Sequence, residues 1–198
     1  MQKISTLFMR DPRDRRRLTR QVHRHCQWVL DGEGVALRKY DGACVVLDDQ
    51  CGRWWARLEV RPPDEPPPNF YHVATDSYTG ILVGLEPIAQ SPYAAYFDEA
   101  IGQYGGTPEP GTYELIGPQI NGNPENVPSH CLISHAQVAL LDNSVRTYDA
   151  LRRYLAELPY EGIVWRHPDG RMAKIKRRDI MDAPPVETAA PENAVSAR

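Results

Sequence analysis

Short apolar runs separated by turn residues follow one another through most of this 198-residue chain. Segments 31–34, 48–52 and 167–170 have turn chemistry. The proline-rich stretch 62–69 cannot continue a hydrogen-bonded ladder, because proline has no N–H to donate. Many short strands joined by such turns favour antiparallel pairing. The pattern therefore predicts an α+β fold dominated by antiparallel sheet.

The spacing of apolar residues predicts where the individual elements lie. Strands are expected at 2–9, 26–30, 35–38, 43–47, 54–60, 79–89, 112–117, 131–133, 137–141, 161–165 and 172–176. Helices are expected at 92–104 and 145–158, and segment 10–24 is expected to be a loop or a short exposed helix. Residues 1–181 would form one domain, and 182–198, rich in Pro, Ala, Glu and Ser, a disordered tail.

Charge and cysteine content exclude some classes of protein. The net charge of −3 does not indicate a general nucleic-acid binder, yet segment 10–24 holds seven arginines and two aspartates. That segment is either a solvated surface or a phosphate-contacting one. The four cysteines form no C-x-x-C and no zinc-site spacing. Without a signal peptide or a long apolar run, the chain is expected to be soluble and cytoplasmic, with no membrane partner.

A lysine motif, Lys39-Tyr40-Asp41-Gly42, lies between two of the apolar runs. Strand backbone on both sides would aim the amine, and Asp41 has the same side-chain parity as Lys39. Gly42 permits a tight turn or the close approach of a ligand. These features suit a lysine that attacks a phosphate as a covalent nucleophile. Taken alone, however, the four residues favour a surface lysine before a β-turn.

Attack on a nucleotide α-phosphate needs cations for the triphosphate, carboxylates for a metal ion and positive charge near the amine. Lys174 and Lys176 share one face of a strand because they are two residues apart. Glu161 begins the preceding strand of that hairpin, and Arg57 follows two tryptophans. Glu114 lies between apolar residues, where an unpaired carboxylate would be costly. Each of these residues alone is best interpreted as an ordinary surface residue. Together they form the set of side chains that a covalent nucleotidyltransferase needs.

The same residues resemble the motifs of the covalent nucleotidyltransferase superfamily of ATP-dependent ligases and capping enzymes. In chain order they resemble motif I at Lys39-Tyr40-Asp41-Gly42, Ia at Arg57, III at Glu114, IV at Glu161 and V at Lys174-Ile175-Lys176. Trp-Ala-Arg-Leu, Glu-Leu-Ile-Gly, Ile-Asn-Gly-Asn-Pro and Glu-Gly-Ile-Val-Trp are similar to a small RNA ligase family with vertebrate and bacterial members. Those enzymes join 5′-phosphate and 3′-hydroxyl RNA ends.

The resemblance implies an antiparallel-sheet nucleotidyltransferase domain of the ATP-grasp-like or DNA-ligase adenylation type. Because the chain stops soon after motif V, a C-terminal OB domain is not expected. The substrates would be ATP, with Mg²⁺ or Mn²⁺, and RNA. Implied roles are AMP attachment for Lys39, metal binding for Asp41 and Glu161, nucleotide binding for Gly42, nucleotide or RNA 5′-phosphate contact for Arg57, ribose binding for Glu114, and phosphate binding for Lys174 and Lys176.

Two points stay open at this stage. In segment 131–141, where the adenine-stacking motif should fall, the only ring is His135, and Val138 or Ile133 is an alternative apolar wall. The acceptor of the AMP is also open: a DNA end or a capping-type reaction is an alternative to RNA. A non-catalytic module that binds RNA ends is a third reading.

Overall fold

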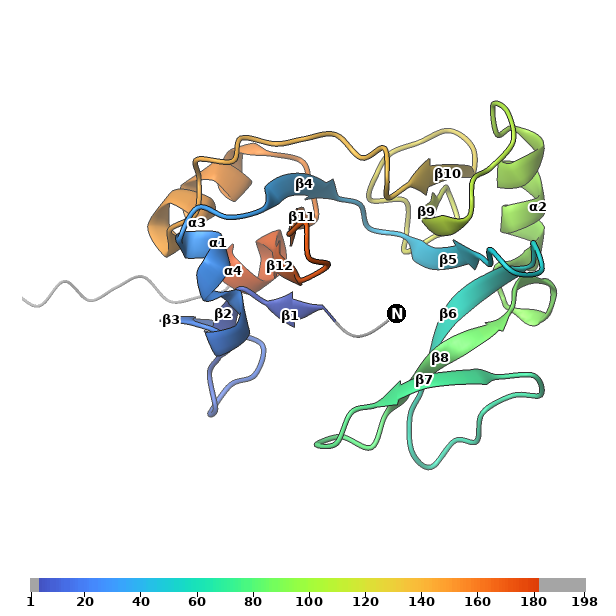
Figure 1. The fold of residues 1–198 in the computed structure, drawn as a ribbon, viewed down its shortest axis with the longest axis horizontal. Coiled ribbons are helices and arrows are strands. Elements are labelled where there is room, and N and C mark those ends of the chain that lie inside the picture. Colours follow the sequence, from blue (N-terminus) through green and yellow to red (C-terminus); the bar gives the residue numbers. More distant parts are fainter. Residues whose placement is uncertain (1–3, 182–198) are drawn as a thin grey trace, which may run out of the picture.

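Two larger β-sheets lie side by side in the computed structural model, which describes residues 4–181 and also contains a two-stranded sheet (Figure 1). The strands are β1 (Ser5–Thr6), β2 (Phe8–Arg10), β3 (Leu18–Val22), β4 (Val35–Lys39), β5 (Ala43–Leu47), β6 (Trp54–Val60), β7 (Tyr71–Thr75), β8 (Leu82–Pro87), β9 (Gly111–Ile116), β10 (Cys131–Ser134), β11 (Gly162–Arg166) and β12 (Met172–Lys176). The α-helices are α1 (Gln27–Leu30), α2 (Ala94–Gly102), α3 (Tyr148–Glu157) and α4 (Arg177–Met181), with 3-10 turns η1 (Arg24–Cys26) and η2 (Ile88–Gln90).

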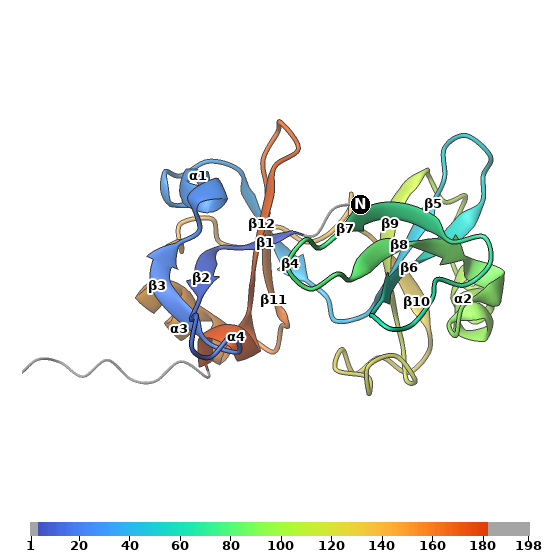
Figure 2. The same ribbon diagram turned by 90° about the horizontal axis from the view of Figure 1, so that it is seen from below.

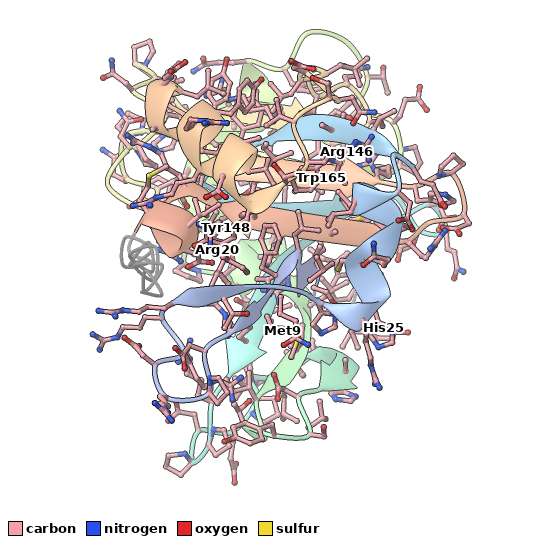
Figure 3. All side chains as sticks on the ribbon, turned by 90° about the vertical axis from the view of Figure 1, so that its left-hand side faces the viewer. Met9, Arg20, His25, Arg146, Tyr148 and Trp165 are labelled. Atoms are coloured by element: carbon pink, nitrogen blue, oxygen red, sulfur yellow. The ribbon has the colours of Figure 1, made fainter. Side chains whose placement is uncertain are left out.

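The first lobe is built on the four-stranded sheet, in the order β1-β12-β11-β4. Its strands are antiparallel except for β1, which pairs parallel to β12. Helices α1, α3 and α4 and the β2–β3 hairpin supply the rest of its core, in which Trp165 and Ile175 are fully buried beside Leu151 of α3. Figure 3 shows Trp165 beside α3. Burying one face in this way leaves the opposite face of the sheet free to line a site.

The second lobe is built on the six-stranded sheet, in the order β10-β9-β5-β6-β8-β7, and all its pairings are antiparallel. Phe97 and Ala100 of α2 pack on this sheet against Val45, Tyr113 and Leu115. The ring of Trp54 lies 4.9 Å from that of Phe97. Figure 2, turned by 90°, shows the two lobes as separate bodies of chain joined by crossing segments.

One of those crossing segments is the lysine motif. β4 of the first lobe ends at Lys39 and β5 of the second begins at Ala43, so Tyr40, Asp41 and Gly42 carry the chain from one sheet to the other. A Cβ on Gly42 would lie 2.3 Å from the carbonyl oxygen of Leu115, which no side chain tolerates. Glycine is therefore required here because the crossing passes directly against β9.

The fold confirms the expected α+β class with mostly antiparallel sheets. Three local predictions were wrong, and one strand was not predicted. Residues 26–30 form η1 and α1 rather than a strand, since a five-residue apolar run does not distinguish the two. Segment 10–24 contains β3, whose pairing with β2 outweighs its weak apolar pattern.

The other two errors concern sheet edges. Segment 137–141 forms no strand and touches β4 through one bridge, Leu37 with Leu140. β7 was not predicted, because this edge strand is largely exposed and carries little apolar signal. The expected disordered tail at 182–198 lies outside the described residues. Between residues 4 and 181, no helix has the length and apolar character needed to cross a membrane.

Candidate active site

Strand register places two of the predicted lysines on either side of a glycine. Lys39 of β4 pairs with Gly162 of β11, and Gly162 pairs with Lys176 of β12. A Cβ on Gly162 would lie 2.0 Å from the Ile175 carbonyl oxygen, so the strands approach too closely for any side chain there. The two ammonium groups therefore converge over a position that carries no side chain of its own.

The carboxylate of Glu161 lies between these two lysines. It forms ion pairs with the ammonium groups of both Lys39 and Lys176, and its side chain is only 8% exposed. Lys39 also donates to the carbonyl of Tyr40 at 3.1 Å. Burial by itself would raise the pKa of Glu161, but the charges and hydrogen bonds of the two lysines outweigh it and hold that pKa below its usual value. Glu161 is thus ionised and fixes both lysines.

Lys174 lies one row further along the same face. It pairs with Val164 of β11, which pairs with Leu37 of β4. Burial, together with the nearby charges of Lys176 and Lys39, lowers the pKa of Lys174 to about 8. A cation held in so unfavourable a position is suited to receive an anionic ligand.

Lys174→Met is expected to raise the free energy of unfolding at pH 7 by about 1–3 kcal/mol. The folded state binds the Lys174 proton less readily than the unfolded state does. The charged side chain therefore destabilises the folded state fully below about pH 8, and this destabilisation fades as the pH rises toward the usual pKa of lysine. Urea unfolding at pH 7 and pH 10 measures this, with exposed Arg153→Met as control. A Lys174→Met protein no more stable than wild type at pH 7 would contradict the claim that the buried charge of Lys174 destabilises the fold.

Glu125, which sequence reasoning missed, holds the lysine motif from the loop before β10. One oxygen accepts a hydrogen bond from the backbone N–H of Asp41 at 2.9 Å, and the other is ion-paired with Arg38. The guanidinium of Arg38 lies 4.2 Å from the ring centres of both Tyr40 and Tyr160. These contacts fix the backbone on both sides of Lys39.

Glu114 holds the other end of the motif. Its Oε1 accepts a hydrogen bond from the backbone N–H of Gly42 at 3.0 Å, and its Oε2 lies 3.1 Å from Nε2 of His135. Nδ1 of His135 lies 2.9 Å from the hydroxyl of Thr112, which suits a ring that donates to Glu114 and accepts from Thr112. Glu114 therefore spans the motif and His135, and its remaining lone pairs are available to a ligand.

Two other predicted residues make different contacts. The carboxylate of Asp41 accepts a hydrogen bond from Asn121 at 3.0 Å and does not line the cleft. Arg57 of β6 lines the cleft and is held by Glu59 at 2.8 Å. Asn121 also donates to the carbonyl of Gly42 at 3.3 Å. The loop that carries Asn121 and Glu125 therefore forms hydrogen bonds with both Asp41 and Gly42 of the motif.

The cleft between the lobes has a volume of about 1010 Å³, enough for a nucleotide. Of the predicted catalytic and ligand-binding residues, Glu161 and Asp41 do not line it, whereas the others do: Lys39, Gly42, Arg57, Glu114, Lys174 and Lys176. The candidate stacking ring His135 lines it as well. Its apolar wall includes Leu37, Val138 and Val164, while Ile133 is not part of the lining. The chain has only four lysines, and three of them line this one cleft.

Within the described residues, the two predicted metal ligands, Asp41 and Glu161, are not part of a resident metal site. Across residues 4–181, no group of three or more His, Cys, Asp or Glu side chains could hold a metal. Mg²⁺ is usually bound through one or two carboxylates together with substrate phosphates and water. In this structure Asp41 lies outside the cleft lining, and the two oxygens of Glu161 are ion-paired with Lys39 and Lys176.

Comparison with known families points to one group. Residues 107–194 match the family model of RNA ligase 1. The match includes Glu114, Glu161, Lys174 and Lys176, whereas Lys39 and Arg57 precede it. It supports an RNA ligase family for the chain. Among curated proteins, no match was found.

Proposed function

We propose that this chain is an ATP-dependent RNA ligase that joins 5′-phosphate and 3′-hydroxyl RNA ends through AMP carried on Lys39. The observation that supports it most is the convergence of Lys39, Lys174 and Lys176 in one cleft, with Glu161 bonded to two of them. The match to an RNA ligase family model supports the same reaction class.

The proposed chemistry has three displacements at phosphorus. Lys39, an ammonium in its ion pair with Glu161, must first lose a proton. The neutral amine then attacks the α-phosphorus of ATP, an N–P bond forms as the P–O bond to pyrophosphate breaks, pyrophosphate leaves with the bonding electrons, and an N–H proton passes to solvent. An RNA 5′-phosphate oxygen then attacks the same phosphorus, which breaks the N–P bond and restores the amine. Finally an RNA 3′-hydroxyl attacks the activated 5′-phosphate, and AMP leaves with the bonding electrons.

The residues of the cleft would contribute mostly positioning and charge. Lys174 and Lys176 would bind the α-phosphate and the leaving groups, and Arg57 the nucleotide or the RNA 5′-phosphate. Glu114 would accept hydrogen bonds from the ribose, and Leu37, Val138 and Val164 would form the wall beside the adenine. Mg²⁺ carried by the triphosphate, with Glu161 and Asp41 as its protein ligands, would neutralise the pyrophosphate that leaves.

Wild-type protein incubated with α-labelled ATP and Mg²⁺ is expected to retain the label after denaturation, and Lys39→Arg is expected to retain none. Arginine keeps the positive charge but is not deprotonated in proteins, so this variant separates a nucleophile from a charge. Arg53→Ala, an exposed turn residue, is the matched control and should label like wild type. Equal labelling of Lys39→Arg and wild type would rule out the proposed intermediate.

A further inference from the structure

One arginine of the loop between β2 and β3 lies against the turn between β7 and β8. The guanidinium of Arg15 lies 4.7 Å from the ring centre of Tyr78. The loop belongs to the first lobe and the turn to the second, and both lie in the lower part of Figure 1. We call Tyr78, Arg15 and the two exposed arginines beside Arg15 in this loop, Arg13 and Arg16, the Arg-Tyr platform.

Six of the seven arginines of segment 10–24 divide into two sets, and the seventh, Arg24, donates to His25 at 3.0 Å. Arg10 is ion-paired with Asp179, Arg17 with Asp14, and Arg20 with Asp149. Arg20 also covers the ring of Tyr148 at the start of α3, as Figure 3 shows. In contrast, Arg13, Arg15 and Arg16 are exposed, and within residues 4–181 none of their side chains forms an ion pair.

The platform is held in shape by its own backbone contacts. The carboxylates of Asp11 and Asp14 accept hydrogen bonds from the N–H groups of Arg13 and Arg16, at 2.8 Å and 3.1 Å. Arg10 donates to the carbonyl of Arg15 at 2.8 Å. On the other side, Asp76 accepts from the N–H of Tyr78 at 3.1 Å. Tyr78 is nevertheless 79% exposed, so a ring face is open to a ligand.

We propose that the Arg-Tyr platform binds an unpaired segment of the RNA substrate, with one base stacked on Tyr78 and phosphates on Arg13 and Arg16. An exposed aromatic ring beside guanidinium groups is the combination that single-stranded nucleic acid recognises, because every base offers a π-face and every phosphate a charge. A duplex keeps its bases stacked and offers the ring nothing. The inference rests on the proposed function for the identity of its ligand.

Fluorescence anisotropy with a labelled single-stranded RNA, without ATP, tests this directly. Tyr78→Ala should weaken binding about 5- to 100-fold, the range that base stacking on an aromatic side chain contributes, and Tyr78→Phe should bind like wild type. Replacing Arg13, Arg15 and Arg16 together by Ala should reduce the slope of log affinity against log salt by about 1.4, because two phosphate contacts to a single strand are lost. Tyr71→Ala, another exposed tyrosine of the β7–β8 hairpin, and Arg53→Ala are the matched controls.

The platform is overturned if Tyr78→Ala binds single-stranded RNA like the Tyr71→Ala control. It is equally overturned if Tyr78→Ala loses as much affinity for duplex RNA as for single-stranded RNA, because stacking then plays no part. Melting temperatures of all variants show whether each is folded. Since the assay contains no ATP, its result does not depend on whether Lys39 is adenylated, and the two proposals can fail separately.

Discussion

Glu125→Ala is expected to lower the free energy of unfolding by about 3–5 kcal/mol and to slow the transfer of AMP to Lys39. Glu125 is 4% exposed and its partner Arg38 22% exposed, so its removal leaves a largely buried guanidinium without its anion. The N–H of Asp41 loses its acceptor in the same step. Since Asp41 follows Lys39 by two residues, the backbone that aims the amine loosens.

Denaturant unfolding and single-turnover labelling with ATP measure the two effects together. Glu157→Ala, an exposed glutamate on α3, is the control and should change unfolding by less than about 0.5 kcal/mol. Arg38→Met combined with Glu125→Ala should cost less than the sum of the two single changes, because the double variant leaves no unpaired charge. Additive costs, or a Glu125→Ala protein as stable as the control, would contradict this role of Glu125.

Glu161→Gln is expected to destabilise the fold by about 3 kcal/mol at neutral pH and to abolish labelling. The substitution keeps the shape but removes the only negative charge that the structure places between Lys39 and Lys176 among the described residues. Because the two lysines hold the pKa of Glu161 below its usual value, its stabilising charge is present above the normal glutamate range. That stabilisation is lost as the pH falls through the lowered pKa.

Unfolding measured across acidic to neutral pH tests the sign of this effect. The difference between wild type and Glu161→Gln should be largest near pH 7 and should shrink as the solution becomes acidic, because wild-type Glu161 then becomes protonated as well. Glu157→Gln should show no such trend. A difference that grows at low pH would mean that Glu161 is not held in its ionised form by the lysines.

The parts of the site that were predicted correctly depend on residues close together in the sequence. The spacing of two puts Lys174 and Lys176 on one face of β12, and the hairpin turn brings Glu161 beside them. The α+β class followed from the same short strands and turns. These features depend on neighbours in sequence, which a pattern of residue types can describe.

The missed residues make contacts between distant parts of the chain. Glu125 reaches Asp41 over 84 positions and Arg38 over 87, from a loop without periodicity. His135 was named from the sequence as the only ring of segment 131–141, but its bond to Glu114, 21 positions away, has no local pattern that predicts it. The Arg15 and Tyr78 contact joins two lobes, and no local pattern relates its two halves.

The most direct test of the central claim is to locate the AMP on the protein. After incubation with ATP and Mg²⁺, proteolysis and mass spectrometry of wild-type protein should find AMP on the peptide that contains Lys39. Addition of RNA with a 5′-phosphate should then remove it. AMP found on Lys174, on Lys176 or at any other residue, or no AMP on fully folded protein, would contradict Lys39 as the nucleophile.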